Sequence, residues 1–303
     1  MTAGGGRAAV LHRPGTVGET VALLAAEQEA GRRVDLLAGG TDLVPALRAG
    51  TRRPGTIVAL RRVVELRVRG AGADTLTVGA GVTYSELAGW SLSPGLAATA
   101  RVVGSTQIRN TGTVGGALGS ANPRGDLLTF LAAAEAEVLL ASVAGVRATD
   151  IASFCREGCR PDELVTAVRV PRPSGPQTYL KIGGRTAAYP ATVSCALLVD
   201  RVRERVSCAI GGIGAGPLRV RAAELFAREE VDWSKGLAGA ATARRFGELV
   251  TQAARETPST LADPRTPPEY RWHAAGVLAA RAFARCLGRI RRPDGGSQRG
   301  RTA

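Results

Sequence analysis

Histidine and clustered cysteine are scarce in this 303-residue chain, and their scarcity excludes most kinds of self-contained catalysis. His12 and His273 are the only histidines, too few for a histidine-based metal site or a Ser-His-Asp triad. The five cysteines are dispersed apart from Cys155 and Cys159, whereas an iron–sulfur cluster needs grouped thiolates and a structural zinc needs two ligand pairs. We expect reduced thiols, no metal on this chain and no catalytic side chain, so any chemistry must come from a bound cofactor.

Long apolar runs are also missing. The stretch that comes nearest to one, residues 127–146, contains Glu135 and Glu137, so we expect no membrane span. The first residues lack the apolar core of a signal peptide, which predicts a cytoplasmic protein. The apolar fraction of 45% is that of a globular chain with a real core.

The net charge of +14 comes almost entirely from arginine, because Lys181 and Lys235 are the only lysines. These arginines are spread along the chain among alanine and glycine and form no stripe, so we do not expect nucleic-acid binding. The one basic run lies at the end, where Gly, Pro and Ser predict a disordered tail over 291–303.

Hydrophobic periodicity predicts a mixed α and β protein with a boundary in the breaker-rich segment 172–177. Thr83 and Glu86 have the spacing of a capping box at a helix start. The pattern predicts helices over 17–30, 94–103, 127–134 and about 269–290, strands over 34–37, 57–60, 76–78, 164–170, 179–182, 193–199 and 206–210, and a hairpin over 138–146.

Two glycine clusters, at 36–43 and 108–128, each follow an apolar run. Glycine permits positive φ and lets a ligand approach the main chain, and successive free amides form a concave site for an anion such as a dinucleotide pyrophosphate. Ordinary tight turns are the alternative. The Rossmann pattern G-x-G-x-x-G is completed nowhere and no Walker A lysine exists, so a dinucleotide site would need another architecture.

Six ordered segments carry a family resemblance across roughly residues 10–285: AGGTDL, TVGAGVTYSEL, GSTQIRNTGTVGGALGSANPRGDLL, ELVTAVRVP, YLKIGGR and CAIGGIGAGPLR. The chain resembles the FAD-binding medium subunit of molybdenum hydroxylases, the carbon monoxide dehydrogenase and xanthine dehydrogenase family. The resemblance implies an α+β fold. Residues 1–175 would form a flavin-binding domain of two α/β lobes, of the vanillyl-alcohol oxidase (PCMH) type. Residues 176–290 would form a domain of the carbon monoxide dehydrogenase flavoprotein type, with a three-stranded antiparallel sheet and helices.

The same resemblance implies where a non-covalent FAD binds. The segments 38–42 and 113–116 match two loops whose amides clamp the pyrophosphate, and Thr41 and Thr113 can add hydroxyl donors. The implied cofactor-binding residues are Leu37, Ala38, Gly39, Gly40, Thr41, Asp42, Val103, Thr113, Val114, Gly115, Gly116, Asp126, Val165, Lys181 and Tyr189.

Three of these residues have implied individual roles. Asp126 matches an acid near the adenosine ribose, although the apolar run after it also suits a helix N-cap. Lys181 matches a lysine that approaches the flavin, and Tyr189 an aromatic placed against the isoalloxazine. The chain departs from the family pattern at Ala117, where asparagine is usual, and at Ala188, where an acid is common.

The implied function is electron transfer. A molybdopterin large subunit would hydroxylate the substrate, and an iron–sulfur small subunit would pass electrons to FAD on this chain, in a dimer of heterotrimers. Two alternatives stay open: a flavin-less assembly subunit of the same fold, favoured by Ala117, and a self-sufficient flavin oxidoreductase. The sequence specifies neither the hydroxylated substrate nor the electron acceptor.

Overall fold

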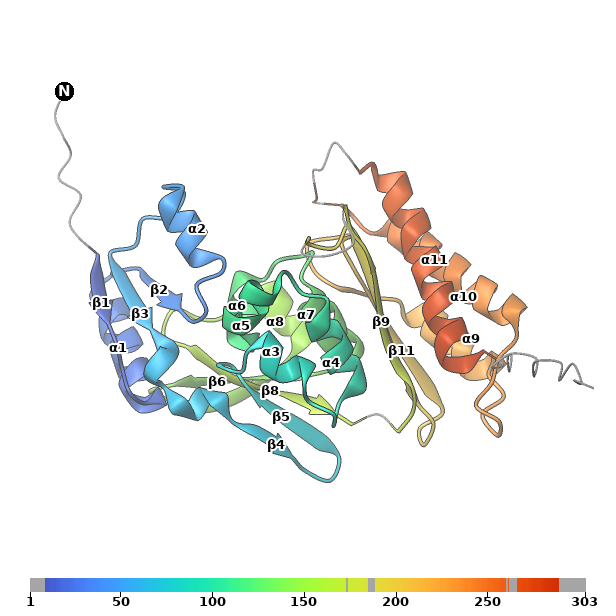
Figure 1. The fold of residues 1–303 in the computed structure, drawn as a ribbon, viewed down its shortest axis with the longest axis horizontal. Coiled ribbons are helices and arrows are strands. Elements are labelled where there is room, and N and C mark those ends of the chain that lie inside the picture. Colours follow the sequence, from blue (N-terminus) through green and yellow to red (C-terminus); the bar gives the residue numbers. More distant parts are fainter. Residues whose placement is uncertain (1–8, 173, 185–188, 260, 262–265, 289–303) are drawn as a thin grey trace, which may run out of the picture.

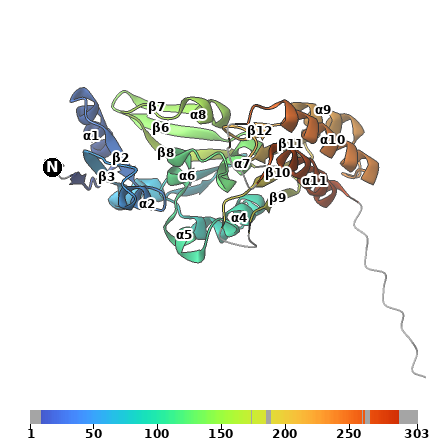
Figure 2. The ribbon, with the colours of Figure 1, turned by 90° about the horizontal axis from the view of Figure 1, so that it is seen from above.

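The computed structural model describes residues 9–172, 174–184, 189–259, 261 and 266–288. The molecule is elongated, with a first lobe at one end, a second lobe in the middle and a C-terminal unit of sheet and helices at the other end (Figures 1 and 2). This is the α+β architecture that the sequence predicts. The predicted tail at 291–303 lies outside the described residues.

The first lobe is a three-stranded parallel sheet of strand order β1-β3-β2. Helix α1 begins where the Thr16 side chain accepts a hydrogen bond from the Glu19 amide, and it buries Val21 and Leu24. The predicted helix over 17–30 and strand over 34–37 are confirmed. The elements are β1 (Val10–His12), α1 (Val17–Glu29), β2 (Val34–Leu37), α2 (Leu43–Arg48) and β3 (Thr56–Ala59).

The second lobe is a five-stranded antiparallel sheet of order β4-β5-β8-β6-β7, with short helices at one side. The predicted capping box is present, because the Thr83 and Glu86 side chains each bond the other's backbone amide at the start of α3. The elements are β4 (Arg69–Ala71), β5 (Thr75–Gly79), α3 (Tyr84–Ala88), α4 (Pro94–Arg101), α5 (Thr106–Thr111), α6 (Val114–Ser120), α7 (Asp126–Ala133), β6 (Glu137–Ser142), β7 (Gly145–Asp150), α8 (Ile151–Glu157) and β8 (Leu164–Pro171).

The C-terminal unit is an antiparallel sheet of order β12-β11-β10-β9, covered on one face by helices α9, α10 and α11. It has four strands where three were expected. The additional strand, β12, contains two residues, too few to show an alternating pattern. The elements are β9 (Gln177–Ile182), β10 (Val193–Asp200), β11 (Arg205–Gly211), β12 (Leu218–Arg219), α9 (Arg221–Glu230), α10 (Ala240–Glu256) and α11 (Pro268–Leu287).

Strand β10 is the centre of this unit, and all eight of its residues are buried. One face, with Ala196 and Leu198, joins the apolar core of the second lobe. The other face, with Cys195 and Leu197, joins a separate core under α9, α10 and α11. The sheet is therefore packed on both sides, and one of its faces lies directly against the second lobe.

An aromatic pair anchors the core beneath the C-terminal helices. Phe246 on α10 and Phe283 on α11 are fully buried, with ring centroids 4.7 Å apart. We expect Phe246→Ala to lower the free energy of unfolding by about 3–5 kcal/mol, because the cavity left behind cannot fully close. Tyr270→Ala removes an exposed aromatic from the same helix pair and should change it by less than about 0.5 kcal/mol. Urea unfolding measures both, and equal losses would contradict this assignment of the core.

Within the described part of the chain, no helix is both long and apolar enough to cross a membrane.

Candidate functional site

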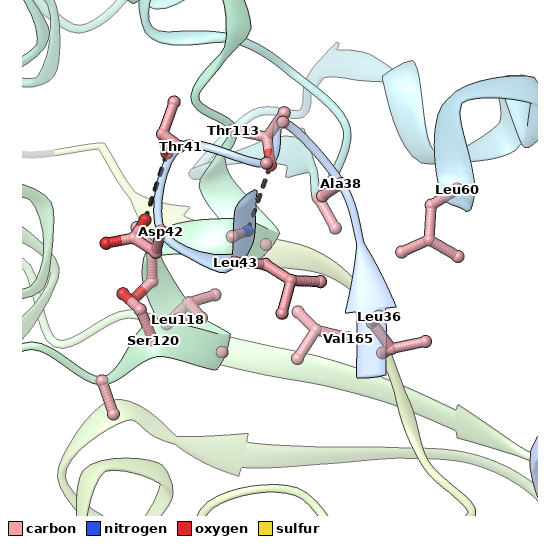
Figure 3. A pocket seen from close by; sticks show the side chains of 18 of the residues that line it. Leu36, Ala38, Thr41, Asp42, Leu43, Leu60, Thr113, Leu118, Ser120 and Val165 are labelled. Atoms are coloured by element: carbon pink, nitrogen blue, oxygen red, sulfur yellow. Dashed lines mark hydrogen bonds between the residues drawn. The ribbon is translucent and has the colours of Figure 1, made fainter. Parts of the chain in front are cut away.

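A cavity of about 1400 Å³ lies where the first and second lobes meet and reaches the loop that follows β9. This is above the roughly 300–1,000 Å³ that is usual for sites of small ligands. The two glycine clusters meet in it, although about seventy residues separate them in sequence (Figure 3). Among the predicted site residues, those that line it are Ala38, Gly39, Gly40, Thr41, Asp42, Val103, Thr113, Gly115, Gly116, Asp126, Val165 and Tyr189.

The first glycine loop, which connects β2 to α2, packs backbone to backbone against the second cluster. A Cβ built on Gly39 would lie 1.9 Å from the Thr111 carbonyl oxygen, so no other residue fits there. Gly40 has φ +73°, a left-handed conformation that favours glycine. No described group accepts a hydrogen bond from the amides of Gly39, Gly40, Thr41 or Asp42. The loop therefore presents a run of free amides beside the cavity.

The second cluster uses most of its amides within the protein. Val114 and Gly115 donate to the carbonyl oxygens of Val82 and Ala80, at 3.0 and 2.7 Å, which fixes α6 on the segment after β5. Gly116 donates to Thr113 Oγ1 at 3.1 Å, an N-cap bond drawn in Figure 3. The Thr113 amide has no described acceptor, and its hydroxyl proton is still free to donate. Among residues 113–116, Thr113 is thus the one that keeps free donors beside the cavity.

Asp126 is buried at the first position of α7, with 7% of its surface exposed. The expected N-cap role is wrong: Gly125 occupies that position, and the Asp126 carboxylate turns to the hydroxyl of Tyr179 (2.5 Å) and to Lys181 Nζ (2.9 Å). Burial raises the pKa of Asp126, while the positive charge of Lys181 and both hydrogen bonds oppose that rise.

Lys181 lies beside the cavity but is not among the residues that line it. Its ammonium donates to Asp126 Oδ2 (2.9 Å) and to the carbonyl oxygens of Val102 (2.7 Å) and Tyr189 (3.3 Å). These three bonds use all the donors of the ammonium group. In this arrangement Lys181 links α7 to the end of α4 and to the chain after β9.

Of the remaining predicted residues, some line the cavity and others do not. Val165 and Val103 give it apolar walls, and Tyr189, 43% exposed, stands at its rim. Leu37 and Val114 are not among the lining residues; Val114 is instead buried in the core of the second lobe. Ala117 lines the cavity where the resemblance implies asparagine, and Ala188 lies outside the described residues.

The sequence also identifies the family directly. Residues 6–173 match the family described as the FAD binding domain in molybdopterin dehydrogenase. The chain belongs to this family. Its relatives include the glyceraldehyde dehydrogenase medium chain of Sulfolobus acidocaldarius, 31% identical over 62% of this chain and 71% of that one. The carbon monoxide dehydrogenase medium chain of Afipia carboxidovorans is 28% identical over 92% of this chain and 97% of that one.

The fold agrees with this membership. The solved carbon monoxide dehydrogenase of Hydrogenophaga pseudoflava superposes with a TM-score of 0.78 and 25% identity, covering 92% of this chain and 98% of that chain. The resemblance found in the six sequence segments is therefore confirmed. The chain is a FAD-binding oxidoreductase subunit of the molybdenum hydroxylase family.

Two tyrosines in or near the cavity were not among the predicted site residues. Tyr84 lines the cavity from the start of α3; burial raises its pKa, and the charges of Asp126 and Asp42 raise it further, so the phenol stays neutral. Tyr179 is buried on β9 and donates to Asp126. Tyr84 lies inside the TYSE capping box, whose position before a helix could have suggested it. For Tyr179 the available signal was its place two residues before Lys181 in a predicted strand, which puts both side chains on one face.

Proposed function

We propose that one FAD binds non-covalently in this cavity and carries electrons between a partner subunit and an external acceptor. The observation that carries the proposal is the meeting of the two glycine clusters around one cavity, with unpaired amides on the first loop. FAD supplies reversible one- and two-electron chemistry, and the protein supplies binding, orientation and electrostatics.

The residues present suit such a cofactor. The amides of residues 39–42 and the Thr113 amide and hydroxyl would hold the pyrophosphate, because a concave run of N–H donors suits an anion. Asp126 would accept hydrogen bonds from the ribose hydroxyls. Val103 and Val165 would contact the apolar flavin ring, and Tyr189 would stack at its edge.

We expect one FAD per chain, released by denaturation. A covalent link is not expected, because neither His12 nor Cys155 lines the cavity. Cys159 does line it, but partial burial of its sulfur and the charge of nearby Glu163 raise the pKa of its thiol to about 11. The as-purified visible spectrum and the supernatant after acid precipitation test this. FMN in the supernatant, a yellow pellet, or a colourless protein that cannot be reconstituted would each contradict it; the last would favour the assembly-subunit alternative.

The electron path requires partners. We infer that an iron–sulfur small subunit and a molybdopterin large subunit join this chain, in a dimer of heterotrimers, because this sequence lacks the cysteine groups for clusters. Its relatives are called medium chains and FAD subunits of dehydrogenases, which supports a division of labour of this kind. Residues 1–175 would form the flavin-binding domain and residues 176–290 the second domain, and we place the whole chain in the cytoplasm.

A further inference from the structure

The carboxylate of Asp126, in the second lobe, is held by a strand of the C-terminal unit (the proposed second domain). Both of its donors, Tyr179 and Lys181, lie on β9, whereas Asp126 itself begins α7 of the second lobe. Both bonds therefore join segments more than fifty residues apart in sequence. Asp126 lines the proposed flavin cavity and the two donors do not, so these side chains of β9 act on the cavity through the groups that they hold: the Asp126 carboxylate and, for Lys181, also the Tyr189 carbonyl oxygen.

The sheet brings these groups together by its register. Residues 179 and 181 alternate onto one face of β9, and Ser194 of β10 lies opposite Lys181 on the same face. That face presses on α7, where Thr129 Oγ1 and Ser194 Oγ are 3.2 Å apart. A Cβ on Gly211 would lie 2.2 Å from Thr129 Oγ1, so the neighbouring strand β11 approaches α7 as closely as a glycine allows. The sheet (β9, β10 and β11) and helix α7 are thus held close together, which fixes the polar contacts between them.

Tyr179 and Lys181 have no proton left for a further hydrogen bond, whereas the Asp126 carboxylate can still accept. The single hydroxyl proton of Tyr179 goes to Asp126 Oδ1, and the three protons of Lys181 go to Asp126 Oδ2 and two carbonyl oxygens. Each carboxylate oxygen retains a further lone pair. The arrangement can therefore orient Asp126 toward a ligand that donates hydrogen bonds, such as a pair of ribose hydroxyls.

We propose that Tyr179 is a positioning residue for FAD: it holds the Asp126 carboxylate, from the second domain, in the orientation that accepts the ribose hydroxyls. The inference rests on the proposed function, because it takes FAD as the ligand. It adds that the second domain contributes to cofactor affinity through one buried hydrogen bond. Tyr179 itself does not contact the cavity, so its effect must pass through Asp126.

The charge state of Asp126 gives this role a distinctive signature. The ionisable groups that face it are Tyr179 and Lys181 from β9 and Tyr84 from α3. Arg124, two residues earlier, directs its Nε to the Ala191 carbonyl oxygen at 2.7 Å. An ionised carboxylate accepts stronger hydrogen bonds from hydroxyl groups than a protonated one, which keeps only part of its acceptor capacity, so FAD affinity must fall as the pH drops through the pKa of Asp126. Removing the Tyr179 hydrogen bond, which lowers that pKa, moves the fall to higher pH.

The test is FAD titration of the full-length protein, in its complex if it purifies with partners, as a function of pH. Tyr179→Phe should weaken binding at pH 7 by about tenfold, the effect of losing a hydrogen bond to a charged group. It should also move the acid limb of the profile, which is the fall in FAD affinity at low pH, to higher pH. Asp126→Ala should remove that limb, and adding Tyr179→Phe to Asp126→Ala should cause no further loss.

Tyr270→Phe, which removes an exposed hydroxyl on α11, is the matched control and should leave the profile unchanged. The proposal would be overturned if Tyr179→Phe left the acid limb of the affinity profile as in the wild type. It would also be overturned if Tyr179→Phe reduced FAD affinity by the same factor in the Asp126→Ala protein as in the wild type. The outcome in which wild-type protein binds no FAD at any pH is distinct, and it would refute the proposed function together with this inference.

Discussion

Gly39→Val should abolish flavin binding, with a loss of affinity of at least about 100-fold. The reason is the 1.9 Å separation between a Cβ at this position and the Thr111 carbonyl oxygen, which is backbone and cannot rotate away. A valine must push the first glycine loop away from the second cluster. The amides of residues 39–42, which we propose hold the pyrophosphate together with Thr113, would then be displaced from Thr113.

Two further glycine variants make this test specific. Gly40→Ala keeps the loop in place but strains a residue with φ +73°, so we expect a smaller loss of about tenfold. Gly55→Ala is the control, because nothing lies within 4 Å of a Cβ there and the residue does not line the cavity. FAD titration monitored by flavin fluorescence, beside circular dichroism of each protein, separates lost binding from lost folding. Full flavin content in a folded Gly39→Val protein would place the pyrophosphate elsewhere.

The elements of the fold were largely predictable because their signals are local. Helix α1 and strand β2 follow from periodicity and a glycine stop, and the hairpin over 138–146 appears as β6 and β7. Strand β12 was not predictable, since its two residues are in a strand only because Ala209 and Ile210 of β11 pair with them. Its existence is a consequence of tertiary structure.

The cavity, too, combines features that the local sequence predicts with features that arise only from tertiary structure. The glycine clusters were identified because their composition is unusual, and the family supplied their pairing across the chain. Which amides stay free was not readable, because Gly115 and Gly116 are satisfied by Ala80 and Thr113 only in the folded chain. The alternation in β9 could have placed Tyr179 and Lys181 on one face. It could not have shown that α7 presents Asp126 to that face.

The free chain loaded with FAD should be unable to oxidise the substrates for which its relatives are named, and turnover should appear only when partner subunits are added. Its described residues contain no group of three or more His, Cys, Asp or Glu side chains that could hold a metal ion. The thiols offer no alternative nucleophile, because burial raises the pKa of Cys155, Cys159 and Cys286 and so keeps these thiols protonated at neutral pH. Under the proposed function, FAD would then receive its electrons from the partner subunits and not directly from the substrate.

The measurement compares three mixtures: the FAD-loaded chain alone, the partner subunits alone, and both together with an electron-accepting dye. We expect substrate-dependent dye reduction above background only in the third. Dithionite should bleach the flavin of the isolated chain, which shows that its cofactor is competent and that substrate activation is the missing step. The folded Gly39→Val protein, lacking flavin, should fail to support turnover when mixed with the same partners. Substrate-dependent bleaching of the isolated chain would instead mean that the cavity, which is larger than usual ligand sites, also admits a substrate, and that the chain is a self-sufficient flavin oxidoreductase.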